Sequence, residues 1–151
     1  MNVSKICRRN VVTVRRFDEL IKAAQLMREK HVGYLVVVEP DLGSELERTV
    51  GVLTDRDLVI SVLAREADPH SLRVEDVMTP QPVTIDESES IEKGLLEMRR
   101  IGVRRLPVAG PRGELAGILS LDDVLDVLAG ELQNVAGSIR NEQRREGVLR
   151  P

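Results

Sequence analysis

Aromatic residues are almost missing from this sequence, which has no tryptophan, one phenylalanine and one tyrosine in 151 residues. Its core must therefore be built from valine, leucine and isoleucine. The flat aromatic platforms on which proteins stack the bases of single-stranded nucleic acids are missing as well. A net charge of −3 gives no overall attraction to phosphate, so the composition argues against a nucleic-acid-binding protein.

Cysteine and histidine are equally scarce. Cys7 is the single cysteine, which excludes an intrachain disulfide and a cysteine zinc cage. His31 and His70 are the only histidines, so no histidine-rich metal site is expected. This inventory contains no nucleophile–base pair and no metal cluster. We therefore expect a protein that is not an enzyme and requires no cofactor.

Long hydrophobic runs are also absent. No apolar run approaches the length of about 18 residues that suggests a membrane span, and the start Met-Asn-Val-Ser-Lys lacks the apolar core of a signal peptide. These features predict a cytoplasmic protein with no membrane partner. The chain is otherwise ordinary for a globular protein, with 42% apolar and 31% charged residues.

The second half of the chain repeats the first. A shift of 71 residues superimposes the apolar positions, for example Val3 on Val74 (74 − 3 = 71). After the polar loop 40–48 the shift falls to 66, and Asp57 falls on Asp123 (123 − 57 = 66). The difference is a five-residue insertion (71 − 66 = 5) in that loop, where insertions between repeats normally occur.

Both copies have the same order of predicted elements, namely strand, helix, strand, strand, helix. We expect the strands at 11–14, 32–38 and 50–53 in the first copy, and at 82–85, 103–108 and 115–119 in the second. Helices should follow the first and last strand of each copy, and Ser88 or Ser90 is the expected cap of the helix that begins near Ile91.

The predicted fold class is therefore mixed α/β, with two pseudo-symmetric units packed together because about 60 residues bury too little surface alone. The predicted domains are a first repeat at 1–66, a linker at 67–72, a second repeat at 73–132 and a helical, charged tail at 133–151.

The tail has an apolar stripe of its own, which runs from Leu128 to Ile139 past Gly130 and Gly137 and precedes a charged segment at 140–146. Two interpretations are open. The helix could fray into a solvated end, or it could bind a partner or brace a dimer.

The most informative motif is a hydroxyl residue, two spacers and an aspartate after the last strand of each copy. It occurs as Thr54 to Asp57 and as Ser120 to Asp123. The pattern is that of a helix capping box, which stabilises a helix by about 1 kcal/mol. A carboxylate there can also accept hydrogen bonds from both hydroxyls of a ribose, while the free amides of the helix start suit phosphate. One aspartate can serve both roles.

The strand before each aspartate offers a floor for a base. Val52 and Thr54 point to one face of their strand, as do Ile118 and Ser120, because side chains alternate with a period of two. A small aliphatic residue followed by a hydroxyl suits an adenine and its sugar.

Arg104 and Arg105 open an otherwise apolar strand. They are either solvated edge charges or phosphate contacts, which the guanidinium group favours. The matching positions of the first copy are Gly33 and Tyr34, so the two pockets should not be equivalent. Tyr34, at the position equivalent to Arg105, is included among the candidate site residues.

With these motifs in order, the chain resembles the CBS-domain family, and specifically a stand-alone tandem pair, or Bateman module. The resemblance covers about residues 3–132 and rests on three features. They are Val77-Met-Thr-Pro80, the run Gly102-Val-Arg-Arg-Leu-Pro-Val108, and the two Gly-x-Leu-Thr/Ser-x-x-Asp junctions. It implies two clefts for adenosine-containing ligands such as AMP, ADP, ATP, NAD or S-adenosylmethionine, and a flat homodimer of pairs.

The family's binding roles are carried over onto matching positions. The resemblance implies ribose binding by Asp57 and Asp123, phosphate or sugar contacts by Thr54 and Ser120, adenine contacts by Val52 and Ile118, and phosphate contacts by Arg104 and Arg105 with Pro107 close by. Thr13 and Thr84 lie in strands that resemble those lining the adenine. The first copy departs from the family pattern, with Cys7-Arg-Arg in place of Met-Thr-Pro.

The leading hypothesis is a regulatory module for signal transduction or energy sensing. An adenine nucleotide would act as its regulatory ligand, and an effector protein would respond to the conformational change. The alternative is a structural interaction scaffold with empty pockets. A third hypothesis, a nucleic-acid binder, would use Arg8, Arg9, Arg15 and Arg16 as a basic patch.

Overall fold

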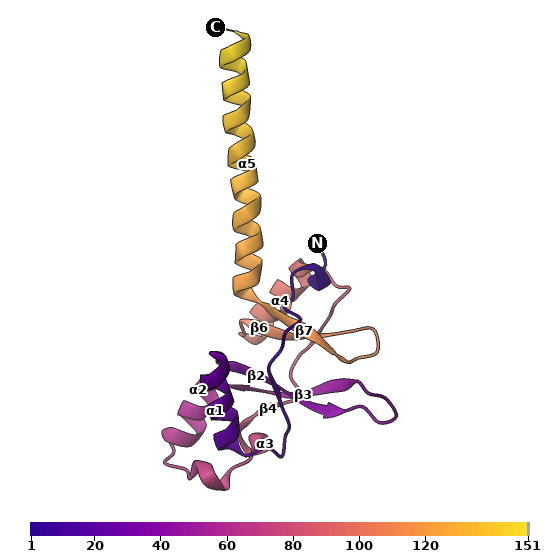
Figure 1. Ribbon diagram of the computed structural model, residues 1–151, viewed down its shortest axis with the longest axis vertical. Coiled ribbons are helices and arrows are strands. Elements are labelled where there is room, and N and C mark those ends of the chain that lie inside the picture. The colour runs from indigo at the N-terminus through magenta and orange to yellow at the C-terminus, as the bar shows by residue number, and fades with distance from the viewer. Residues whose placement is uncertain (151) are drawn as a thin grey trace.

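The computed structural model describes residues 1–150 and contains two α/β units, from which one long helix extends (Figure 1). Each unit has the order strand, helix, strand, strand, helix. This order confirms the predicted mixed α/β fold with two pseudo-symmetric repeats.

The first unit contains β1 (Thr13–Val14), α1 (Leu20–Lys30), β2 (Tyr34–Pro40), β3 (Glu47–Thr54), α2 (Asp55–Leu58) and a π-helical turn, η2 (Val59–Leu63). The second contains β5 (Ile85–Asp86), α4 (Ile91–Ile101), β6 (Arg105–Ala109), β7 (Leu115–Ser120) and α5 (Leu121–Leu149). Four short elements lie outside this order. η1 (Val3–Lys5) precedes the first unit in the chain, and η3 (Pro69–Ser71), α3 (Val74–Val77) and β4 (Thr79–Pro80) lie between the first unit and the second.

Each unit is organised around a small sheet. The first has the strand order β1-β2-β3-β4 and the second β5-β6-β7. In each sheet the opening strand pairs parallel to the next, and a hairpin follows. The register places Tyr34 opposite Thr54 and Arg105 opposite Ser120. The start of one hairpin strand therefore lies beside the end of the other, next to each predicted junction.

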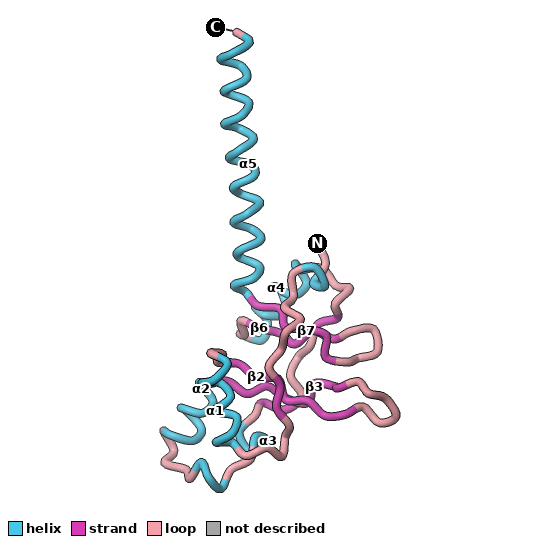
Figure 2. The backbone as a smooth tube through the Cα atoms, in the orientation of Figure 1, coloured by secondary structure: helices cyan, strands magenta, loops and turns pink. Residues whose placement is uncertain are grey.

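The segments that open the two repeats have exchanged places. We call residues 1–10 the first arm and residues 72–81 the second arm. Val3 is fully buried in the core of the second unit, and Val74 is fully buried in the core of the first. Backbone bonds fix the exchange, since the Val3 N–H donates to the Glu89 carbonyl at 2.9 Å and the Val74 N–H donates to the Asp18 carbonyl at 3.0 Å. Figure 2 shows the N-terminal segment beside α4 and β7.

The exchange has a consequence for the predicted domain ranges. Residues 1–66 and 73–132 divide the chain by its sequence repeat, but each hydrophobic core contains residues from both ranges. Each core is thus completed by an arm that the sequence repeat assigns to the other unit.

Two glycines make room for the crossing arms. A Cβ atom on Gly117 would lie 2.7 Å from the backbone oxygen of Arg8, and one on Gly51 would lie 3.2 Å from that of Thr79. A side chain at Gly117 would force the first arm away from β7, to which the Arg8 N–H and carbonyl are hydrogen-bonded. The glycine that opens each junction motif is therefore needed for the close approach of the arm.

Helix α4 begins at Ser90, whose Oγ accepts the Lys93 N–H at 3.2 Å. Ser88, the other predicted cap, instead donates its hydroxyl to Asp86. The sequence pattern allowed either serine, and the structure selects the one directly before the apolar helical stripe.

The tail is helical almost to its end. Helix α5 continues through Gly130 and Gly137 to Leu149, over 29 residues and a length of roughly 44 Å. Every residue from Glu131 to Arg150 is exposed except the half-buried Gly137. The helix therefore includes the charged segment at 140–146, and its apolar stripe is exposed. Within residues 1–150 no helix, α5 included, combines the length and the apolar character needed to cross a bilayer.

Candidate functional site

Two clefts lie between the units, and each is built from both. The first cleft contains Val52, Thr54 and Asp57, from the end of β3 and the start of α2. Its other walls are Thr79 and residues 81–83, at and after the end of the second arm, and residues 101–107, which run from the end of α4 into β6. Its volume is about 730 Å³. That lies within the range of about 300 to 1,000 Å³ typical of small-molecule sites.

The second cleft is related to the first by the pseudo-symmetry. It contains Ile118, Ser120 and Asp123 from β7 and α5, and its other walls are the first arm and the segment 31–34. Its volume is about 280 Å³. The backbone of the two clefts is similar, but the second is much the smaller.

Asp57 is held by the cap of its helix. The Thr54 N–H donates to Asp57 Oδ2 at 2.8 Å, and the Asp57 N–H donates to Thr54 Oγ1 at 3.1 Å, which completes the predicted capping box. Within residues 1–150 the other carboxylate oxygen, Oδ1, has no hydrogen-bond donor. A carboxylate fixed through one oxygen and open at the other can accept a hydroxyl group without losing its cap.

Asp123 is engaged through both oxygens. Arg8 Nε donates to Oδ1 at 2.8 Å, Arg8 Nη2 forms an ion pair with the same oxygen at 2.8 Å, and the Ser120 hydroxyl donates to Oδ2 at 2.5 Å. Burial raises the pKa of Asp123, but the hydrogen bonds from Arg8 and Ser120 and the nearby positive charges outweigh it. The pKa therefore lies below its ordinary value. A ribose in the second cleft must compete with Arg8 for this carboxylate.

Tyr34 and Arg105 line both clefts and occupy equivalent positions in the two repeats. The Arg105 guanidinium lies over the Tyr34 ring, 5.6 Å from its centroid, in a cation–π contact. Burial raises the pKa of the Tyr34 hydroxyl, and the charge of Arg105 offsets part of that increase. The tyrosine is therefore neutral, and the pair forms the wall shared by the two clefts.

Arg104 lies on the wall of the first cleft that is formed by the second unit. Its only ion pair within residues 1–150 is a long one to Asp122 at 3.3 Å, and both side chains are mostly exposed. Such a pair contributes little to stability. Arg104 is thus available to an anion. Arg104 and Arg105 both come from the second repeat, but they line the cleft that contains Asp57.

The structure brings ten of the twelve predicted residues to the clefts. The first cleft has Val52, Thr54, Asp57, Arg104 and Pro107, the second has Ile118, Ser120 and Asp123, and both have Tyr34 and Arg105.

Thr13 and Thr84 are the two predicted residues that do not line either cleft. Thr13 lines neither cleft, and Thr84 lines a separate hollow of about 400 Å³ beside Arg16 and Arg48. The preceding residues, Val12 and Val83, line the clefts instead. Successive side chains of an extended segment point to opposite sides, so Val12 and Val83 face the clefts while the next residues, Thr13 and Thr84, do not.

Arg8 is a site residue that the sequence analysis did not assign to a cleft. It follows Cys7 in the first arm, 115 positions from Asp123, and it reaches the second cleft only because the arms cross. A signal was present, since the repeat alignment places Arg8 on Thr79, which lines the first cleft. Substitution of a small hydroxyl residue by arginine at equivalent positions changes the chemistry of the cleft.

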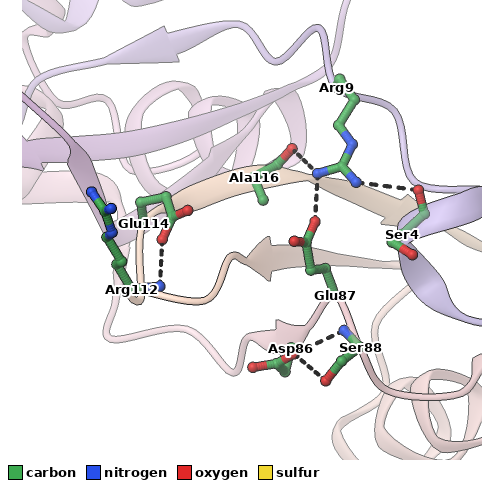
Figure 3. A network of polar contacts seen from close by, with 8 residues as sticks. All are labelled: Ser4, Arg9, Asp86, Glu87, Ser88, Arg112, Glu114 and Ala116. Atoms are coloured by element: carbon green, nitrogen blue, oxygen red, sulfur yellow. Dashed lines mark hydrogen bonds and ion pairs between the residues drawn. The ribbon is translucent and has the colours of Figure 1, made fainter.

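The neighbouring Arg9 anchors the first arm (Figure 3). Its Nη1 donates to Glu87 at 2.7 Å and to the Ala116 carbonyl at 3.2 Å, and its Nη2 donates to the Ser4 carbonyl. These bonds tie the arm to the second unit and so help to place Arg8 beside Asp123.

The four arginines considered as a basic patch are all paired with acidic residues. Arg8 and Arg9 contact Asp123 and Glu87, and Arg15 and Arg16 contact Glu47 and Glu39. Their charges are therefore offset locally, which does not favour a surface for nucleic acid.

Comparison with known proteins agrees with this architecture. The CBS domain profile matches residues 3–64 and 74–130. The uncharacterized protein YlbB of Bacillus subtilis is 34% identical over 137 residues, which are 87% of each chain. The uncharacterized protein MK0525 of Methanopyrus kandleri is 31% identical over 127 residues, and the matched region is 84% of this chain and 62% of that longer protein.

Several solved structures share this fold, among them one that contains ligands. It is the CBS domain pair of protein MJ0100 in complex with 5-methylthioadenosine and S-adenosyl-L-methionine. Its TM-score is 0.71 at 20% identity, with coverage of 85% of this chain and 99% of that one, so the likeness is one of fold. With two profile matches over most of its length and a relative that aligns almost end to end, this chain belongs to the CBS-domain family.

Proposed function

We propose that this protein is a non-catalytic regulatory module that binds an adenosine-containing nucleotide in the first cleft. The observation that supports this most directly is the arrangement around Asp57. A capped carboxylate with one free oxygen suits the ribose hydroxyls, while Arg104 and Arg105 on the opposite wall suit phosphates. Val52, Val83 and the other apolar residues of the cleft suit the base.

The ligands of the MJ0100 domain pair belong to the same chemical class, since both contain adenosine. We propose AMP, ADP, ATP, NAD and S-adenosylmethionine as the candidates for this chain. The paired arginines favour those that carry phosphate groups, because guanidinium binds phosphate in a bidentate manner.

Signalling would follow from the position of the cleft. A ligand that contacts both Asp57 and Arg105 bridges the two units and touches the shared Tyr34–Arg105 wall. Its binding energy then favours one relative arrangement of the units. We propose that an effector protein responds to this arrangement.

The test is a dye-based thermal melt with AMP, ADP, ATP, NAD, S-adenosylmethionine and GTP. A ligand at 100 times its dissociation constant stabilises the folded state by about 2.7 kcal/mol. That corresponds to a rise in Tm of roughly 5–10 °C for a chain of this size. We expect the rise with at least one adenine ligand and none with GTP.

Asp57→Ala should abolish the ligand-induced rise and should also destabilise the free protein by about 1 kcal/mol, because a helix cap is lost. Asp76→Ala is the matched control. Asp76 caps α3 in the same way, with the Arg73 N–H donating to its Oδ2 at 2.8 Å, but it lines neither cleft. A rise that persists in Asp57→Ala would contradict the ribose role. No rise with any ligand would favour a structural scaffold with empty clefts.

A further inference from the structure

Helix α5 carries an apolar stripe that the rest of the chain leaves uncovered. The α5 stripe consists of Leu125, Leu128, Leu132, Val135 and Ile139, whose exposed fractions lie between 47% and 70%. The residues are separated alternately by three and four positions. This is the heptad spacing with which helices pair lengthwise, and it differs from the wider face that a helix presents to a globular core.

The helix also has little to stabilise it in isolation. Gly130, Gly137 and Gly147 lie in its interior, where glycine is less favourable than alanine, and a Cβ atom on any of them would meet no neighbouring atom within 4 Å. None of the residues from Glu131 to Arg150 is buried. Helices in water depend mainly on the packing of an amphipathic face, so the α5 stripe needs a partner.

The charges of α5 are separated along its length. Residues 121–139 contain four acidic residues and no basic one, which gives a net charge of −4. Residues 140–150 contain four arginines and two glutamates, which gives +2 (4 − 2 = 2). Whatever covers this helix should present basic groups to its first part and acidic groups to its last part.

A second copy of α5 meets that requirement in one orientation. We propose that the α5 stripe packs against the α5 stripe of a second copy of this chain, with the two helices antiparallel. The basic end of each helix then lies beside the acidic start of the other, an attractive arrangement.

A parallel pair would be unfavourable. Glu142 and Glu146 continue the stripe at the same heptad spacing. In a parallel pair each of these glutamates would face the same residue of the partner, and the like charges would repel. The acidic first parts of the two helices would also lie side by side and repel each other.

The apolar residues also define the register. With the two-fold axis between Leu132 and Val135, Leu132 of one copy packs against Val135 of the other, and Leu128 packs against Ile139. These four residues then face apolar partners, and Leu125, the fifth residue of the stripe, lies opposite Glu142 at the margin of the contact (132 + 135 − 125 = 142). The two modules would lie at opposite ends of the helix pair.

The first test is the mass of the protein in solution, measured by sedimentation equilibrium. We expect the wild-type protein to be oligomeric and Leu132→Glu to halve the mass of its assembly. The matched control is Asn134→Glu, which places the same charge on the opposite face of the helix and should leave the mass unchanged. A monomeric wild-type protein, or an unchanged mass for Leu132→Glu, would overturn the proposal.

The second test needs no disruptive variant and determines the orientation. Leu128→Cys and Ile139→Cys are prepared as separate chains, mixed and oxidised. We expect disulfide-linked dimers in the mixture and none in either chain alone, because residue 128 faces the partner's residue 139. Buried Cys7 is present in every sample, so the wild-type chain gives the background. Cross-linking of each variant with itself would mean a parallel pair and would overturn the antiparallel arrangement.

Discussion

The two clefts are built from equivalent elements of the two repeats and differ in chemistry. In the first, the arginines come from the start of β6 and lie across the cleft from Asp57. In the second, Arg8 comes from the arm and contacts Asp123 directly. The difference arises at two pairs of equivalent positions, where Thr79 corresponds to Arg8 and Gly33 to Arg104. Duplication has thus kept the frame of the site, while two substitutions have separated the roles of its copies.

The position of the arginine relative to the aspartate determines how it affects ligand binding. Across the cleft it leaves the carboxylate free and adds affinity for phosphate. In contact with the carboxylate it occupies the hydrogen-bonding positions that a ribose would use, and it reduces the space available. We therefore expect the first cleft to be the ligand site and the second to be closed by Arg8.

The sharpest way to break this asymmetry is Arg8→Ala. The substitution frees Asp123 Oδ1 and enlarges a cleft of about 280 Å³. We expect titration calorimetry, with whichever adenine ligand raises the Tm in the thermal melt, to give one site per chain for the wild type and two for the variant. Adding Asp123→Ala to Arg8→Ala should return the value to one. A stoichiometry that stays at one in Arg8→Ala would show that Arg8 does not close the cleft.

A second comparison concerns phosphate. Removing both arginines of the first cleft, with Arg104→Ala and Arg105→Ala together, should weaken ATP binding at least tenfold, because each charge-assisted hydrogen bond contributes about 1.5–3 kcal/mol. Adenosine should be affected much less. Arg99→Ala with Arg112→Ala removes the same charge from exposed positions outside the clefts and serves as the control. Equal losses for ATP and adenosine would mean that the arginines only maintain structure.

The smallest expected effect is on stability and depends on pH. The folded-state pKa of Asp123 is lowered by Arg8, so their ion pair stabilises the protein at neutral pH and is lost as the pH falls through that pKa. Arg8 is 70% exposed, and such pairs contribute about 0–1 kcal/mol.

We therefore expect thermal melts to show Arg8→Ala slightly less stable than the wild type at pH 7. The gap should stay nearly constant down to about pH 4, the ordinary pKa of an aspartate, and narrow below it as the pH falls through the lowered pKa of Asp123. If the gap stays constant or widens below about pH 4, the ion pair is not the source of the difference.

The sequence predicted what depends on local pattern. The strands, the helices and both hydroxyl–aspartate junctions could be placed because periodicity and capping act over a few residues. Ser90 and Asp57 took the roles expected of them at helix starts.

What depends on the packing of distant segments could not be predicted in this way. Nothing local shows that Val3 packs into the second core or Val74 into the first, so the sequence alone did not place Arg8 beside Asp123. The same limit applied to Arg104 and Arg105, which the repeat assigns to the second unit but which face the aspartate of the first. Thr13 and Thr84 show a different limit, because adjacent positions in an extended segment lie on opposite faces.

The crossing of the arms also determines the order in which parts of the chain can fold during synthesis. The first unit needs only the second arm, which follows it directly in the chain. The first arm must wait for partners as far as 115 residues away, which a ribosome working at about 5–20 residues per second takes roughly 6 to 23 s to make. During that interval Val3 and Cys7 have no core to enter. The end of the chain that is made first is thus among the last to be folded.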